Sequence, residues 1–155
     1  MKPIDNHRLE QSRSQRILWL LEELKVPYEL EIFHRDPKTH FAPPELKKVH
    51  ALGKSPVISV TAPGSSEPVI VAESALVVEY LLDHFANGST LLPKRWKEGQ
   101  EGKVGGETEE WLRFRYYMHY AEGRYVSTFL SFINYNYYSQ EIYISCLQNA
   151  SSKLC

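Results

Sequence analysis

Two neighbouring segments, Lys54-Ser55-Pro56-Val57-Ile58 and Val69-Ile70-Val71-Ala72-Glu73-Ser74, carry the most information in this chain. They are short apolar runs joined by a Pro-Gly-Ser-Ser turn, which predicts a β-hairpin. A proline beside a strand is unusual because proline cannot donate to a sheet ladder. Glu73 and Ser74 place a carboxylate and a hydroxyl where a helix begins, a position that attracts anions. The two segments predict a site that holds a small zwitterionic peptide by its backbone and its charged ends.

The segment before the hairpin predicts a helix over residues 12–25. Ser12 and Gln15 have the spacing of a capping box, so Ser12 is the expected N-cap, and Pro27 ends the helix. The apolar side chains that recur at helical spacing are Ile17, Leu20, Leu21 and Leu24.

Strands are expected over residues 28–33, 56–61 and 68–72, with a short helix over 44–50. In the first of these strands, alternation puts Tyr28, Leu30 and Ile32 on the buried face. Ser74 is the expected cap of a second long helix, whose buried face carries Val77, Val78, Leu81, Leu82 and Phe85.

The order becomes that of a thioredoxin-like α/β domain if a strand precedes Ser12. Residues 4–9 are the candidate, although they are polar for a central strand, and only Ile4 and Leu9 are expected in the core. We therefore predict a thioredoxin-like domain over 1–86, a linker over 87–106, and the first helix of a partial all-α domain over 107–133. An apolar stripe with helical spacing indicates that the last helix packs on a neighbour; it consists of Trp111, Phe114, Met118, Ala121, Tyr125, Phe129 and Phe132.

Composition limits the classes of function. The net charge of −1 predicts no binding to nucleic acid, and no apolar run is long enough to span a membrane. The N-terminus has no apolar signal core, so we expect a soluble, cytoplasmic protein. The only cysteines, Cys146 and Cys155, argue against a disulfide framework or a structural zinc site.

Residues 9–24, 42–58 and 72–75, with 113–123, resemble fungal and bacterial glutathione S-transferases of the serine type. The resemblance covers about residues 7–130. It implies a glutathione-binding domain followed by a helical domain that completes a pocket for an apolar electrophile. It also implies that glutathione is a co-substrate and that the reaction needs no metal or cofactor. A homodimer is compatible with the resemblance.

The resemblance implies a role for seven residues. Pro56 matches the family's cis-proline, with the backbone of Ser55 facing the cysteinyl part of glutathione. Lys54 matches the partner of the glycyl carboxylate, and Glu73 with Ser74 matches the pair that holds the γ-glutamyl end. Ser12 matches the catalytic hydroxyl that stabilises the thiolate, and Ser14 is the alternative.

Each assignment has a structural alternative. Ser12 sits where an N-cap belongs, and both roles can hold at once. Glu73 and Ser74 would cap a helix, Lys54 would be a solvated lysine, and Pro56 would be a loop proline. Tyr116, Tyr117 and Tyr120 flank the apolar stripe and are candidates for lining the co-substrate pocket.

The predicted activity is glutathione conjugation or glutathione-dependent peroxide reduction. Two other classes remain: a non-catalytic interaction module or inactive truncated product, and a glutaredoxin-like reductase. The reductase is disfavoured because Ser12-Arg13-Ser14-Gln15 stands where such enzymes have Cys-x-x-Cys. Family members usually have a larger helical domain, so we expect a truncated second domain, with residues 134–155 as an unmatched tail from noncoding sequence or alternative splicing.

Overall fold

The computed structural model describes residues 2–86 and 88–121. The chain forms two compact units, residues 1–93 and 94–155. Within the described residues, we find no helix with the length and apolar character needed to cross a membrane.

The first unit contains seven of the secondary-structure elements in the order expected for a thioredoxin-like domain. Their bounds are β1 (Ile4–Leu9), α1 (Ser14–Glu23), β2 (Tyr28–Phe33), α2 (Leu46–Val49), β3 (Val57–Val60), β4 (Val69–Ala72) and α3 (Ser74–Phe85). The hairpin predicted from the first two segments is β3 and β4, which pair in an antiparallel register. The predicted fold class is confirmed.

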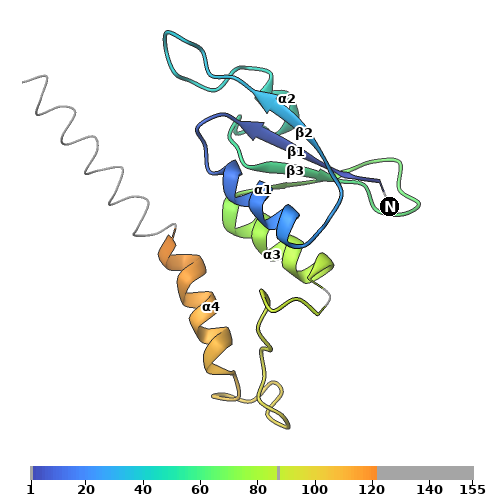
Figure 1. Ribbon diagram of the computed structural model, residues 1–155, viewed down its shortest axis with the longest axis vertical. Helices are drawn as coiled ribbons and strands as arrows, with labels where there is room; N and C mark the ends of the chain where they lie inside the picture. Colours follow the sequence, from blue (N-terminus) through green and yellow to red (C-terminus); the bar gives the residue numbers. More distant parts are fainter. Residues whose placement is uncertain (1, 87, 122–155) are drawn as a thin grey trace, which may run out of the picture. The chain divides into compact units, whose positions relative to one another are not determined.

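A four-stranded mixed sheet with the order β2-β1-β3-β4 is the centre of this unit. Strand β1 pairs parallel with β2 and antiparallel with β3. Helices α1 and α3 lie together against one face, and α2 lies toward the other (Figure 1). On the α2 side, Leu46 packs with Leu9 and Phe33. The core of the α1/α3 side is built from Ile4, Ile58 and Val71 of the sheet with Ile17, Leu21, Val77 and Leu81 of the helices.

The polar β1 is a central strand, as the predicted element order required. The expectation that only its ends belong to the core is wrong, because Asn6 and His7 are also buried. The buried His7 ring makes two side-chain hydrogen bonds, one between Nδ1 and the Glu31 carboxylate at 2.6 Å and one between Nε2 and the Ser59 hydroxyl at 2.7 Å. Asn6 has neither: its amide nitrogen and oxygen are buried without a hydrogen-bond partner.

The predicted buried face of β2 is also wrong in part. Leu30 and Ile32 remain 39% and 47% exposed, whereas Phe33 is buried. Strand β2 is at the edge of the sheet. Helices α1 and α3 contact chiefly the other strands, so the α1/α3 face is not fully covered at β2.

The second unit contains helix α4 (Glu109–Tyr120), whose N-cap is Thr108, with its side chain accepting from the N–H of Trp111. Three i to i+3 backbone hydrogen bonds fold residues 97–106 into successive turns, closed by the N–H of Lys97 donating to Gly106. The described part of the predicted stripe, Trp111 to Ala121, is partly buried. Its continuation at Tyr125, Phe129 and Phe132, and the predicted tail, lie outside the described residues.

Candidate functional site

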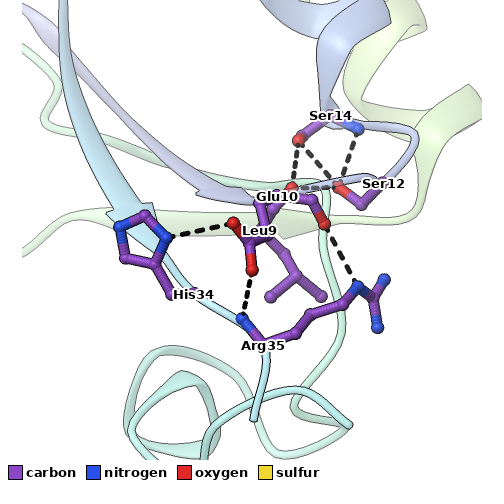
Figure 2. Close-up of polar contacts among 6 residues, drawn as sticks. All are labelled: Leu9, Glu10, Ser12, Ser14, His34 and Arg35. Carbon is purple, nitrogen blue, oxygen red and sulfur yellow. Dashed lines mark hydrogen bonds and ion pairs between the residues drawn. The ribbon is translucent and has the colours of Figure 1, made fainter. Parts of the chain in front are cut away.

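The end of β1 is surrounded by three serine hydroxyls. Leu9 donates its N–H to Ser55 Oγ at 3.2 Å, and its carbonyl accepts from Ser12 Oγ at 2.6 Å and from Ser14 Oγ at 3.2 Å. The two hydroxyls of Ser12 and Ser14 are 2.8 Å apart (Figure 2). Ser55 Oγ also donates to the carbonyl of His7 at 2.9 Å. One backbone residue therefore links the predicted catalytic serines to the residue before Pro56.

The two catalytic candidates differ in accessibility. Ser14 is fully buried as the first residue of α1, whereas Ser12 is partly exposed. The prediction that Ser12 is the N-cap is wrong: the N-cap is Arg13, which makes no side-chain capping bond. The Ser12 hydroxyl donates to the carbonyl of Leu9 and also accepts the N–H of Ser14, the first residue of the helix, at 3.3 Å. The N-cap position therefore lies one residue later than the sequence pattern indicated.

The Ser55–Pro56 peptide bond is cis, as the resemblance implied. Pro56 is buried and leads directly into β3, while Lys54 is exposed before it. In the next strand, Ala72 pairs with Val57, so the residue that follows β4, Glu73, comes at the same end of the hairpin as the residue that precedes β3, Pro56. The C-terminal end of β1, the N-terminal end of β3 and the C-terminal end of β4 consequently lie at the same end of the sheet.

Glu73, and not Ser74, occupies the N-cap position of helix α3. Glu73 is the N-cap of α3, with φ of 78°, and Ser74 is the first helical residue and is buried. The prediction that Ser74 caps the helix is therefore wrong by one residue. A non-glycine residue at such a φ is strained, and strain of this kind concentrates at functional sites.

Sequence reasoning missed a cluster beside Ser12. The Glu10 carboxylate accepts the backbone N–H of Arg35 at 2.8 Å and contacts His34 Nδ1 at 3.1 Å. These two contacts, the backbone N–H first, hold the pKa of Glu10 below its ordinary value. The Arg35 guanidinium in turn donates to the Glu10 carbonyl (Figure 2). The sequence signal for this cluster was that a charged residue, Glu10, follows β1 and that His34 and Arg35 follow β2.

The adjoining loop is closed by Asp36. Its carboxylate accepts the backbone N–H groups of Thr39 and Lys38 at 2.7 and 2.9 Å and the hydroxyl of Thr39 at 3.0 Å. These hydrogen bonds lower the pKa of Asp36. Among residues 2–86 and 88–121, no three His, Cys, Asp or Glu side chains are grouped so that they could hold a metal ion.

The sequence of this chain is similar to that of known proteins. The family model described as "Glutathione S-transferase, N-terminal domain" matches residues 12–84. Glutathione S-transferase 1 of Saccharomyces cerevisiae is 35% identical over 117 residues, which are 76% of this chain and 44% of that protein. The chain belongs to the glutathione S-transferase family.

Two further glutathione S-transferases have similar identity to this chain. Glutathione S-transferase 3 of Schizosaccharomyces pombe is 34% identical over 116 residues, 75% of this chain and 40% of that protein. The crystal structure of a glutathione S-transferase from Actinobacillus pleuropneumoniae is 34% identical with a TM-score of 0.55, covering 74% of this chain and 45% of that one. The chain thus spans less than half the length of these relatives.

Proposed function

We propose that the first unit binds glutathione at the end of the sheet where β1 ends, β3 begins and β4 ends. We also propose that the protein acts as a glutathione S-transferase, with glutathione as its co-substrate. The observation that carries the proposal is the Leu9 junction, because it brings Ser12 to the same backbone residue as Ser55. The match of residues 12–84 to the family's N-terminal domain supports it.

In this proposal the peptide lies along the backbone of Ser55, as an added strand would. Exposed Lys54 pairs with the glycyl carboxylate. At the other end, Glu73 faces the γ-glutamyl amine, and the first turn of α3 with Ser74 takes the γ-glutamyl carboxylate. Ser12 is partly exposed whereas Ser14 is fully buried, which favours Ser12 as the proposed catalytic residue, with Ser14 as the alternative.

The chemistry requires one proton donor. In the structure Ser12 donates to the Leu9 carbonyl, and rotation of the hydroxyl would aim the same proton at a glutathione sulfur. A hydrogen bond to the charged form lowers a thiol pKa and raises the thiolate fraction. The thiolate then attacks an electrophilic carbon: a C–S bond forms, the bond to a leaving group such as chloride breaks, and the thiol proton goes to solvent. Peroxide reduction would use the same thiolate: the O–O bond of the peroxide breaks to give an alcohol and water, while two glutathiones are oxidised to a disulfide.

A second candidate is a non-catalytic glutathione-binding module. It is favoured by the two hydrogen bonds that the Ser12 hydroxyl makes within the chain, to the Leu9 carbonyl and to the Ser14 hydroxyl, because they engage the proton that catalysis would need. Glutathione binding without turnover would be its signature.

The test measures binding and turnover separately. Calorimetry with glutathione gives the dissociation constant, and a chlorinated dinitrobenzene gives the conjugation rate. We expect Ser12→Ala to lower kcat/KM by about 10²-fold, in the range of one lost transition-state hydrogen bond, with glutathione still bound. The control is Ser66→Ala in the exposed turn between β3 and β4, which should leave both unchanged. Failure of the unaltered chain to bind glutathione would refute the proposed function.

A further inference from the structure

The turn that carries Ser12 has an unfavourable backbone. Strand β1 ends at Leu9, and two residues later Gln11 has φ of 47°. Only glycine adopts this region without cost, so a glutamine there needs support from its surroundings. The orientation of the next residue, Ser12, depends on that support.

The side chain of Arg35, which follows the neighbouring strand β2, contacts this turn. The Arg35 guanidinium donates through Nε to the Glu10 carbonyl at 3.2 Å, through Nη2 to the Gln11 carbonyl at 3.4 Å, and through Nη1 to the His40 carbonyl at 2.9 Å. The first two carbonyls belong to the two residues directly before Ser12. The third belongs to the loop after β2, so Arg35 joins this loop to the turn.

The connection is reciprocal. While the guanidinium donates to the backbone of Glu10, the carboxylate of Glu10 accepts the backbone N–H of Arg35 at 2.8 Å. The Glu10 N–H donates to the Phe33 carbonyl at 3.0 Å and continues the β1–β2 pairing. The sheet therefore places the backbone of Arg35 beside the turn, and the guanidinium contacts two of the turn's carbonyls.

We propose that Arg35 is a positioning residue: by binding the carbonyls of Glu10 and Gln11 it holds the Ser12 hydroxyl where it can stabilise a glutathione thiolate. This inference rests on the proposed function. The planar guanidinium presents several donors in a fixed fork, whereas a lysine ammonium is a single point on a flexible stem. Lysine at this position should therefore replace the charge but not the orientation.

The variants are Arg35→Ala and Arg35→Lys, with Lys38→Ala as the control. Lys38 lies in the same loop and its removal changes the net charge equally, but only its backbone N–H takes part in the Asp36 turn. Three quantities are measured: amide hydrogen exchange of a peptide spanning residues 9–16, the dissociation constant of glutathione, and the thiol pKa of bound glutathione from thiolate absorbance.

We expect both Arg35 variants to exchange faster by about tenfold in residues 9–16, with the hairpin β3–β4 unchanged. Glutathione affinity should change less than about threefold, while the thiol pKa rises by about one unit toward the free value near 8.5. Lys38→Ala should match the unaltered protein in all three measurements.

Each contrary result has a separate meaning. A large loss of affinity with an unchanged thiol pKa would make Arg35 a direct ligand contact and overturn the positioning role. Unchanged hydrogen exchange in residues 9–16 would overturn it as well, even if the protein binds no glutathione. If the unaltered protein does not lower the thiol pKa but Arg35→Ala still loosens the turn, the proposed function fails and the catalytic part of this inference fails with it.

Discussion

Replacing Asn6 by valine should stabilise the protein. Asn6 is fully buried in the central strand β1, and both polar atoms of its side chain lack a hydrogen-bond partner. Burial of an unpaired amide costs about 1–3 kcal/mol in mutational data. Valine removes this cost, resembles asparagine in size, and is favoured in strands on a scale that spans about 1 kcal/mol.

Part of the gain will be lost to imperfect packing, because dense cores rarely accept a new shape without adjustment. We therefore expect a net stabilisation of about 1–2 kcal/mol. Since 1 kcal/mol shifts the midpoint of a 60–100-residue domain by about 4–8 °C, the melting temperature should rise by roughly 4–16 °C. Circular dichroism melts and urea unfolding of the full chain measure both quantities.

The matched variant is Asn6→Asp, which keeps the side-chain shape and adds a buried carboxylate without a partner. It should be less stable than the original at pH 7. If Asn6→Val is instead destabilised by more than about 1 kcal/mol at an unchanged urea m-value, the Asn6 amide must be hydrogen-bonded in solution. The reasoning from an unsatisfied buried amide would then be refuted.

Three further changes have expected outcomes. The pKa of Glu10 is lowered below its ordinary value of 4.5, chiefly by the backbone N–H of Arg35. Its contribution to stability is therefore present above pH 4.5 and is lost as the pH falls through the lowered pKa. Glu10→Gln should flatten this acid-side decline in thermal melts. Ser55→Ala removes two hydrogen bonds that tie the backbone of β1 to the start of β3, and urea unfolding should show a loss of about 1–3 kcal/mol; an unchanged midpoint would contradict it. Gly106→Ala would place a Cβ 2.2 Å from the backbone oxygen of Gln100, so residues 97–106 should exchange amide hydrogens faster, whereas equal exchange would show that the loop can adjust.

Much of the first unit could be predicted from local pattern. Apolar spacing located α1 and α3, and the Pro-Gly turn between two apolar runs located the β3–β4 hairpin. These features depend on neighbours within a few residues, where periodicity and turn chemistry act directly. The same locality explains the errors at helix starts, since Ser12 and Ser74 fit the composition of a cap, but the N-cap positions are Arg13 and Glu73.

The arrangement of the site depended on contacts between distant residues. Arg35 reaches the carbonyl of Gln11, 24 positions earlier in the chain, and His7 reaches Ser59, 52 positions later. Such pairs form only after the strands have taken their order and register, and a shift of one residue would send these side chains to the opposite face. The chain's local pattern was therefore enough to place its helices and strands, while the packed sheet decided that Ser12 is partly exposed, that Ser14 is buried, and that Arg35 contacts the carbonyls before Ser12.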